Sequence, residues 1–331
     1  MNTPAPESTQ STPLTLMAIH AHPDDEVVFT GGILPVYHDR GVRTVLVCCT
    51  GGEEGEIHDP DLDPDEARPR LGAIRAGELA GAVKALDIDV LEMLGYRDSG
   101  MAGTEANANP ACFHQAPRDE ATARLVALVR RYQPQVLVTY NDFGSYGHPD
   151  HIAAHQITMA AYDLAADPAY RPDLGAPWAP LKLYYTAWPE ESFEKARAMY
   201  QERGLKWPWD EDEKPEDTDP EHQSDEEGVS AEMAEETKPA EPEKPKYEPP
   251  PVTTRIDVRA GVARKIQAFL CHRTQFMHEG LFMSMPEDIA PVAFGEDDFT
   301  LVRSRIAAPS PETDLFAGIA APALQPADQM C

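Results

Sequence analysis

Short apolar runs alternate with longer amphipathic stretches in the first half of the chain. Runs rich in aliphatic and β-branched residues predict strands over Leu14–His20, Thr44–Cys49, Val90–Leu94 and Gln135–Tyr140. Helix-length segments between them predict helices over Glu26–Arg40, Arg68–Leu86 and Glu120–Tyr132. Gly41 ends the first helix and Pro134 follows the last, since both residue types interrupt helical backbone. This alternation is typical of an α/β fold with a mostly parallel sheet and helices on both faces.

Composition divides the chain of 331 residues into folded and weakly folded parts. The weakly folded parts are predicted to be a flexible leader (1–13), an acidic, proline-rich disordered insertion (206–252) and a loosely attached tail (309–331). Residues 14–205 carry the alternating pattern, and residues 253–308 are expected to complete the same domain. The sequence therefore predicts a single domain interrupted by one insertion.

Net charge is −29, and the insertion holds much of it. Between Asp210 and Pro250 there are 17 acidic residues against 4 lysines, which accounts for −13 and leaves −16 elsewhere. An acidic docking arm is one interpretation of this segment. A solvated, tolerated insertion is favoured because long surface loops cost little entropy to close. Partners such as nucleic acid or an anionic membrane need clustered Lys and Arg, so the balance argues against both.

The chain also lacks the signals of membrane insertion or secretion. No run approaches the ~18–20 apolar residues of a spanning helix, and residues 1–13 have neither a basic start nor an apolar stretch. Cytoplasmic localisation is expected. The five cysteines are too few and too irregular for a disulfide scaffold, and none forms a C-x-x-C pair. Cys48 and Cys49 are expected to be buried small hydrophobes, so any metal must be held by histidine and carboxylate.

Two polar motifs follow predicted strands, at the edge where α/β sheets bind ligands. The first is Ala21–Glu26 (AHPDDE), directly after the first strand. The second is Tyr146–His151 (YGHPDH), just beyond the fourth strand. Pro149 suits the first helical position, which makes His148 the helix cap and places the next two residues in the first turn.

The residue types of these motifs suit a catalytic metal site. Such a site commonly takes three N or O ligands and leaves a position for water, and His22, Asp25 and His151 fit that number. Asp24 is then available as general base, and His148, oriented by Asp150, can stabilise or protonate the product. Zn²⁺ is expected, although Fe²⁺ suits the same donors.

Each motif alone has a simpler interpretation. A histidine beside proline in a loop is usually a surface residue, and Asp24 and Asp25 could be a helix N-terminal pair favoured by the dipole. Two such motifs, each after a strand, together favour a metal-dependent hydrolase. A dinucleotide oxidoreductase is disfavoured because the first turn lacks G-x-G-x-x-G.

At these motifs the chain resembles the PIG-L / LmbE-like N-acetylglucosaminyl deacetylases, most closely the branch of the mycothiol deacetylase and the mycothiol S-conjugate amidase. The resemblance covers residues 14–205 and resumes over 253–275, with further shared stretches at Thr50–Glu56, Arg97–Met101 and Leu181–Tyr185. It implies a Rossmann-like α/β fold and zinc-dependent amide hydrolysis. It also implies the roles already given for six residues: His22, Asp25 and His151 as ligands, Asp24 as base, and His148 with Asp150 as the acid or oxyanion pair.

The resemblance extends to substrate contacts. Tyr146 matches a tyrosine that assists the oxyanion, Arg75 and Asp98 match sugar-contacting positions, and Met101 is assigned to the same substrate site. Simpler alternatives are that Arg75 lies on a solvated helix face and that Asp98 pairs with its neighbour Arg97.

The acidic loop after the second predicted strand is a further candidate. Glu53, Glu54 and Glu56 could bind a cationic or hydroxyl-rich group, with Glu53 assigned to the substrate site. A solvated acidic loop is the equal alternative.

The expected reaction is removal of an N-acetyl group from an N-acetylglucosaminyl substrate of the GlcNAc-inositol type. One alternative keeps the site but cleaves mycothiol or bacillithiol S-conjugates, which Lys182–Tyr185 and the Phe113 region favour weakly. Another is a catalytically silent sugar-binding protein, against which the intact Asp24 argues. The expected partner is thus a small N-acylated amino sugar or thiol conjugate, and the oligomeric state, a homo-oligomer included, is left open.

The chain departs from the family pattern in two places. Val27–Gly32 replaces more polar residues after the first motif, and the insertion before Thr253 is longer and more charged than the family core requires. These differences bear on the substrate rather than on the reaction.

Overall fold

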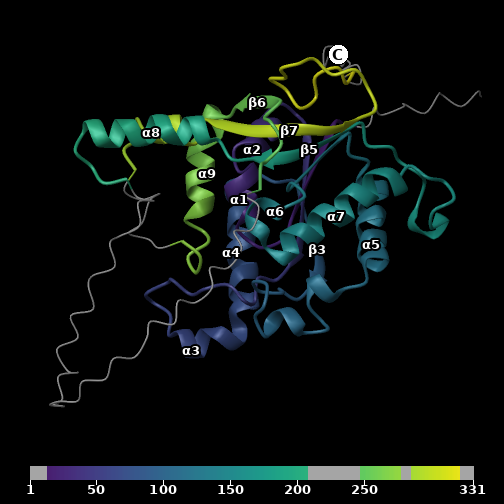
Figure 1. The fold of residues 1–331 in the computed structure, drawn as a ribbon, viewed down its shortest axis with the longest axis horizontal. Helices are drawn as coiled ribbons and strands as arrows, with labels where there is room; N and C mark the ends of the chain where they lie inside the picture. The colour runs from purple at the N-terminus through teal and green to yellow at the C-terminus, as the bar shows by residue number, and fades with distance from the viewer. Residues whose placement is uncertain (1–12, 208–246, 277–284, 321–331) are drawn as a thin grey trace, which may run out of the picture.

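The computed structural model describes residues 13–207, 247–276 and 285–320 (Figure 1). Nearly all of the predicted leader and most of the acidic insertion, residues 1–12 and 208–246, lie outside the described residues. Within the described ranges, seven strands form one sheet in the order β3-β2-β1-β4-β5-β7-β6. The strands are β1 (Thr15–His20), β2 (Arg43–Thr50), β3 (Val90–Tyr96), β4 (Val136–Thr139), β5 (Lys182–Ala187), β6 (Thr254–Asp257) and β7 (Glu296–Ser304).

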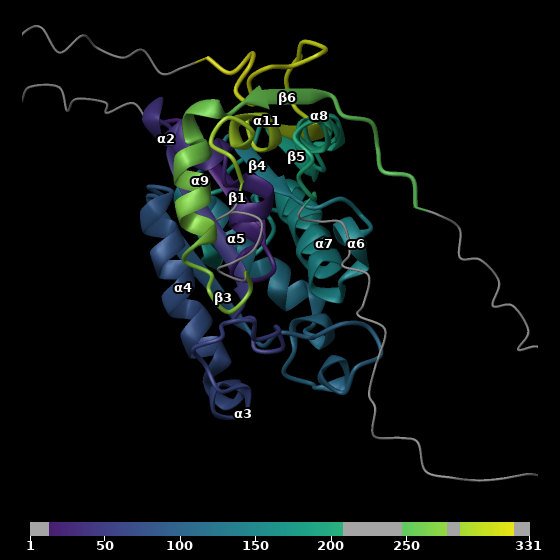
Figure 2. The ribbon, with the colours of Figure 1, turned by 90° about the vertical axis from the view of Figure 1, so that its left-hand side faces the viewer.

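The sheet is parallel from β3 to β5, whereas β7 runs antiparallel to both β5 and β6. The helices that cover it or flank the site are α1 (Asp25–Thr30), α2 (Ile33–Asp39), α3 (Pro64–Ala67), α4 (Leu71–Ala85), α5 (Arg118–Tyr132), α6 (Gly144–Gly147), α7 (Pro149–Leu164), α8 (Glu190–Glu202), α9 (Val262–Phe269) and α11 (Ala290–Ala293). Figure 2 shows α4 and α9 on one side of the sheet and α7 on the other.

Side chains of β1 alternate between two hydrophobic cores. Leu16 and Ala18 pack into the core that includes α2, α4 and α9. Met17 and Ile19 pack into the core that includes α5 and α7. Residues 16–19 of this strand are buried on both faces and are all apolar, which makes the run recognisable in the sequence. The predicted α/β fold with a mostly parallel, two-sided sheet is confirmed.

The predicted helix over Glu26–Arg40 is wrong in one respect, because two helices, α1 and α2, occupy it. They are separated at Gly31 and Gly32. A Cβ on Gly32 would lie 2.5 Å from the Asp297 carboxylate, whose Oδ2 accepts a hydrogen bond from the Ile33 N–H at 2.9 Å. The close approach of a distant carboxylate, which also caps α2, ends the first helix.

The prediction of a loosely attached tail from residue 309 is wrong for residues 309–320. Glu312 is 2% exposed, and Leu315 and Phe316 belong to the first core. The Glu312 carboxylate accepts hydrogen bonds from Lys182 Nζ at 2.5 Å and Tyr184 Oη at 2.7 Å, both on β5. A buried lysine needs a counter-ion, and this segment supplies it. Residues 321–331 lie outside the described residues.

The two ends of the acidic insertion are also anchored more firmly than predicted. Trp207 is buried in the cluster formed by α8, α9 and α11. Tyr247 stacks on Phe143 with ring centroids 4.7 Å apart. The predicted boundaries at 206 and 252 are therefore too wide for the described residues, since aromatic packing holds both flanks.

Two further observations concern the chain as a whole. Cys48 and Cys49 are buried on β2 as predicted, and burial raises the pKa of both thiols. Within the described ranges, none of the helices has both the length and the apolar character needed to cross a bilayer.

Candidate active site

The loops after β1, β2, β3 and β4 meet at one edge of the sheet, as expected for parallel strands. They enclose a cavity of about 480 Å³. Its polar lining residues come from all four loops and include His22, Asp24, Asp25, Glu54, Glu56, Asp98, Tyr146 and His148. Both motifs predicted to carry chemistry therefore lie in one site.

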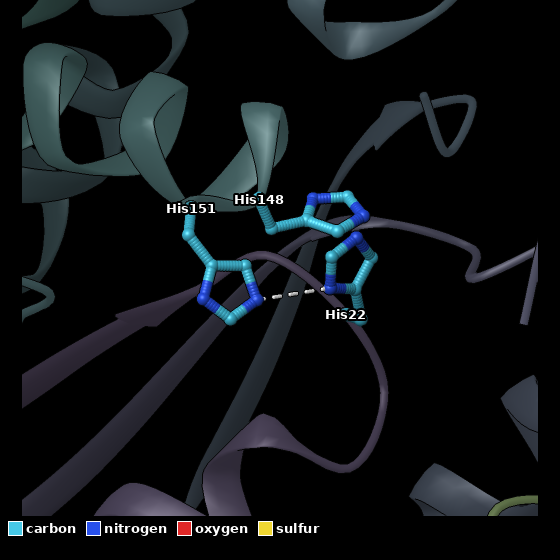
Figure 3. Close-up of side chains that lie close together, drawn as sticks. All are labelled: His22, His148 and His151. Carbon is cyan, nitrogen blue, oxygen red and sulfur yellow. Dashed lines mark hydrogen bonds between the residues drawn. The ribbon is translucent and has the colours of Figure 1, made fainter. Parts of the chain in front are cut away.

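Three donor groups converge on one point beside this cavity. His22 Nδ1 lies 3.2 Å from His151 Nε2 and 3.3 Å from Asp25 Oδ2, and Asp25 Oδ1 lies 3.3 Å from His151 Nε2. Tetrahedral ligands about 2.0–2.1 Å from a zinc ion would be about 3.3–3.4 Å apart, so these separations fit such an ion. Figure 3 shows the rings of His22 and His151 facing each other, with His148 alongside.

His148 belongs to the same cluster. One ring nitrogen from each of His22, His148 and His151 lies within 4.8 Å of the others. Asp25 also has a carboxylate oxygen 3.3 Å from a ring nitrogen of each of His22 and His151, so the carboxylate and His148 are both positioned to supply a third ligand. The predicted ligand set is thus brought together, with His148 beside it.

The second ring nitrogen of His22 faces two carboxylates. Nε2 lies 3.3 Å from Asp150 Oδ2 and 3.5 Å from Asp98 Oδ1. The Ser99 backbone N–H and hydroxyl both donate to Asp150 and hold it in place. A metal-binding histidine commonly donates its other N–H to a carboxylate in this way, which fixes the ring and raises its basicity.

Charge around the cluster is complementary to a cation. Burial alone would lower the pKa of His22, but Asp98, Asp150 and Asp25 raise it well above its ordinary value. Burial alone would raise the pKa of Asp25, but His151 and His22 hold it well below its usual range. Carboxylates that stay ionised around buried imidazoles are the donor set that a divalent metal requires.

Asp24 has a strained backbone at the mouth of the site. Its φ is 122°, in the left-handed region that non-glycine residues rarely adopt. Its carboxylate Oδ2 accepts a hydrogen bond from Arg75 Nη2 at 3.0 Å. Burial raises the pKa of Asp24 to about 7, with Arg75 opposing the rise. A carboxylate tuned to this range can take a proton near neutral pH.

A buried pair that the sequence did not reveal supports Asp24. The Asp24 backbone N–H donates to Glu26 Oε2 at 2.9 Å, and the other carboxylate oxygen of Glu26 lies 2.6 Å from His272 Nε2. Both side chains are fully buried. His272 is 246 residues away in the chain, so local pattern gave no signal; the only hint was that the resemblance resumes over 253–275.

His148 is fixed by the backbone of α7. The Asp150 backbone N–H donates to His148 Nδ1 at 3.1 Å, which confirms the predicted cap and places the proton of a neutral ring on Nε2. Burial, together with His22 and His151, lowers the pKa of His148 to about 4. Asp150 thus orients His148 through its backbone N–H, whereas its carboxylate bonds Ser99 and faces His22.

Two tyrosines flank His151. Tyr146 lies at the cavity wall, 55% exposed, with its hydroxyl 3.5 Å from His151 Nε2. Tyr140 is buried and stacks on the His151 ring with centroids 4.0 Å apart, while its hydroxyl accepts the Ala21 N–H at 2.7 Å. The sequence predicts Tyr140 only as the last residue of a strand, because no local pattern indicates its stacking on His151.

Three of the four predicted substrate contacts, Arg75, Asp98 and Met101, line the cavity. Asp98 and Met101 line the cavity, and Asp98 does not pair with Arg97, which instead contacts Glu54. Arg75 also reaches the cavity but is only 2% exposed, so the solvated-face alternative is wrong.

The prediction that Glu53 contacts substrate is not supported by its position. Its Oε2 accepts the Asp98 N–H at 2.9 Å, behind the cavity wall, and Glu54 and Glu56 line the cavity instead. Loop geometry decides which of three neighbouring glutamates faces inward, and that is not visible in the sequence.

Comparisons with known proteins agree with this geometry. The family model described as PIG-L: GlcNAc-PI de-N-acetylase matches residues 17–162, a range that includes both histidine motifs. A protein of Geodermatophilus obscurus named 1D-myo-inositol 2-acetamido-2-deoxy-alpha-D-glucopyranoside deacetylase is 38% identical over 92% of this chain and 97% of its own length. A protein of the same name from Streptomyces scabiei is 39% identical over 92% of this chain and 89% of its length.

Solved structures support the fold. The N,N'-diacetylchitobiose deacetylase of Pyrococcus horikoshii aligns with a TM-score of 0.51 at 18% identity, over 87% of this chain and 83% of its own. The 4-carboxy-2-hydroxymuconate hydratase of Pseudomonas putida aligns with a TM-score of 0.53 at 15% identity, over 89% and 99%. A deacetylase and a hydratase share the fold, so the reaction must be argued from the site. The chain is 38–39% identical to these relatives over 92% of its own length, and the family model matches across both motifs. The chain therefore belongs to the PIG-L family.

Proposed function

We propose that this protein hydrolyses the N-acetyl amide of an N-acetylglucosaminyl-inositol, using a divalent metal held by His22, Asp25 and His151. The observation that carries the proposal is the convergence of these three donors within 3.2–3.3 Å beside the half-buried carboxylate of Asp24. The relatives named as deacetylases of such a substrate support it. Zinc is the proposed metal, because two imidazoles and one carboxylate are its usual set in hydrolases.

When bound, such a metal lowers the pKa of a water molecule and polarises the acyl carbonyl. The remaining work falls to this chain's own residues. Asp24 accepts the proton of the attacking water, whose oxygen forms a bond to the carbonyl carbon. The Nε2–H of His148 donates to the oxyanion that develops, and the Tyr146 hydroxyl lies on the same side of the cluster. The C–N bond then breaks as the nitrogen takes the proton from Asp24, which yields a free amine and acetate.

The rest of the cavity suits a sugar. Asp98, Glu54, Glu56 and Gln275 present oxygen and amide groups to it. Such side chains bind hydroxyl groups in a concave site, where each unpaired polar group would otherwise be penalised. The Asp98 carboxylate is itself held by the N–H groups of Gly100 at 2.9 Å and Glu54 at 3.3 Å. Burial would raise its pKa, but His22 and these contacts lower it, so it remains an acceptor.

The test is amine release from N-acetylglucosaminyl-inositol by the purified full-length chain, combined with metal analysis. We expect release that a chelator abolishes and added Zn²⁺ restores. Asp24→Asn should keep the metal and lose turnover, since the amide cannot accept the proton. Metal-loaded protein that releases no amine, but binds the sugar, would instead establish the silent sugar-binding alternative.

A further inference from the structure

A second cavity, of about 770 Å³, adjoins the catalytic one. The two share three lining residues, Phe29, Tyr146 and Trp188, so these side chains form a common wall between them. The second cavity lies between the α6 loop, the end of β5 and the segment 247–252, which follows the acidic insertion. Its volume lies in the range that small-molecule sites usually have.

The chemistry of the second cavity contrasts with that of the first. Aromatic and prolyl side chains dominate its lining: Phe29, Phe143, Tyr146, Trp188, Tyr247, Pro249, Pro250 and Pro251. Of the described residues in this lining, Glu190 alone is charged, whereas those of the catalytic cavity include five carboxylates, an arginine and two histidines. A ligand that fills both cavities must therefore carry a polar part and an apolar part.

Exposed apolar side chains gather around these two cavities. Among the described residues, seven large hydrophobic side chains are exposed, and five of them line one cavity or both: Met101, Phe143, Tyr146, Trp188 and Val252. Trp188 is 55% exposed, which is costly for so large an aromatic surface. Clustered exposed apolar surface beside a polar site commonly marks a place where a ligand completes the burial.

The aromatic wall is held in place before any ligand arrives. Tyr247 stacks on Phe143, and its hydroxyl donates to Asp142 Oδ1 at 2.5 Å. Trp188 stacks on Phe193 with ring centroids 5.0 Å apart. The Thr300 hydroxyl donates to the Pro251 carbonyl at 2.9 Å and fastens the prolyl segment to β7. Walls that are already fixed by contacts with neighbouring side chains lose little entropy when they bind.

From this geometry we infer that the second cavity binds an aromatic group carried by the substrate, while the sugar occupies the catalytic cavity. The inference rests on the proposed function and extends it to a substrate class: N-acylated glucosamines that bear an aryl substituent. The bond cleaved is still the amide C–N bond, and the products are the free amine of the glucosaminide and the carboxylate of the acyl group. The aryl group could belong to the aglycone or to the acyl chain, and both place the same chemistry against the same wall.

The experiment compares kcat/KM of the metal-loaded full chain on matched substrates. One arm sets the 2-naphthyl glycoside of N-acetylglucosamine against the methyl glycoside. The other sets the N-phenylacetyl amide of methyl glucosaminide against the N-acetyl amide. We expect an advantage of about tenfold for the aryl substrate in one arm, since stacking and burial of one ring contribute on that scale. The arm that shows it identifies which end of the substrate reaches the wall.

Variants at Tyr247 assign the effect to the wall. Tyr247→Ala should remove most of the aryl advantage and leave kcat/KM for the methyl N-acetyl substrate unchanged. Tyr247→Phe keeps the ring and should keep the advantage. Tyr170→Ala, at a half-buried tyrosine outside both cavities, is the matched control.

The outcomes separate this inference from the proposed function. Turnover of the methyl substrate with equal or lower kcat/KM for both aryl substrates would overturn the inference alone. No turnover of any substrate would contradict the proposed function. Calorimetric binding of the naphthyl glycoside then decides the inference: binding weakened by Tyr247→Ala supports it, and no binding overturns it.

Discussion

At the scale of the residue, Asp24 combines strain with function. A non-glycine residue at φ 122° costs on the order of 1–3 kcal/mol, and such strain persists only where the surroundings enforce it. Here the enforcing contacts are Glu26 on its N–H and Arg75 on its carboxylate. The sequence of the AHPDDE motif therefore predicts a catalytic site, but it does not predict the role of Glu26, the last residue of the motif. Glu26 is a positioning residue whose partner, His272, lies in the other half of the chain.

Glu26→Gln should impair turnover more than folding. The amide keeps one acceptor oxygen, so either the Asp24 N–H or His272 loses its partner. A displacement of the base of about 1 Å can cost about 10²-fold in rate, so kcat should fall by roughly 10- to 100-fold with metal content unchanged. Glu78→Gln is the matched control, since Glu78 bonds Thr274 in the same C-terminal segment without touching Asp24. Equal kcat losses in the two variants would refute the positioning role.

Substitution of His148 should lower kcat, whereas substitution of His151 should lower metal content. His148→Asn keeps a side-chain acceptor at the α7 cap but removes the Nε2–H donor, so kcat should fall about 10²- to 10³-fold with metal retained. His151→Ala removes a proposed ligand and should lose the metal. Metal analysis of each purified variant beside its kcat checks both statements. Loss of metal from His148→Asn would make His148 a ligand.

At the scale of the element, predictability followed burial. The parallel strands β1–β4 lie within two residues of their predicted bounds. Burial on both faces explains this for β1, β2 and β4, because such strands are largely apolar. The edge strand β3 is only half-buried and is indicated by its aliphatic residues. The edge strand β6 and its neighbour β7 escaped prediction, since β7 carries Glu296, Asp297 and Asp298 and β6 is only four residues long. The break between α1 and α2 depends on Asp297, 264 residues from Ile33, and no local pattern encodes it.

The ion pair between Glu312 and Lys182, which joins the C-terminal segment to β5, should contribute strongly to the stability of the fold. Glu312→Leu leaves Lys182 buried without a counter-ion and should cost about 3–5 kcal/mol of unfolding free energy. The double variant Lys182→Met/Glu312→Leu should recover much of that loss, because two apolar groups replace the buried pair. Urea denaturation of the two variants and the wild type measures both effects. A double variant no more stable than the single one would contradict this account.

At the scale of the whole molecule, the sequence supplied the two motifs but not the way they interlock. Each motif is local, a strand followed by a turn, so residues such as His22 and His151 could be assigned from spacing. The contact of Asp150 with His22 and the support of His151 by Tyr140 depend on β1 pairing with β4, an adjacency that periodicity does not reveal. The net charge of −29 says little about this arrangement, because −13 of it lies between Asp210 and Pro250.

Replacing residues 208–246 with a neutral Gly/Ser linker of equal length should leave catalysis intact. The change removes 16 acidic residues and 4 lysines, yet the proposed substrate is uncharged and both flanks are anchored by Trp207 and Tyr247. We expect kcat/KM to stay within about twofold at low and high salt, since charge steers charged ligands only. A scrambled acidic segment is the control for charge alone. A larger change in the linker variant would favour the docking-arm interpretation.

The fastening of Glu312 to Lys182 has a consequence for synthesis. A growing chain that has emerged only as far as β5 already contains every proposed metal ligand, yet its Lys182 has no counter-ion and its Glu26 has no His272. Domains generally fold as units as they leave the ribosome, and here the contacts that support the base and neutralise Lys182 need residues 272 and 312, which are synthesised late. A prematurely terminated chain would thus combine a full metal-binding set with an unfinished core. We therefore expect activity only after Glu312 has been synthesised.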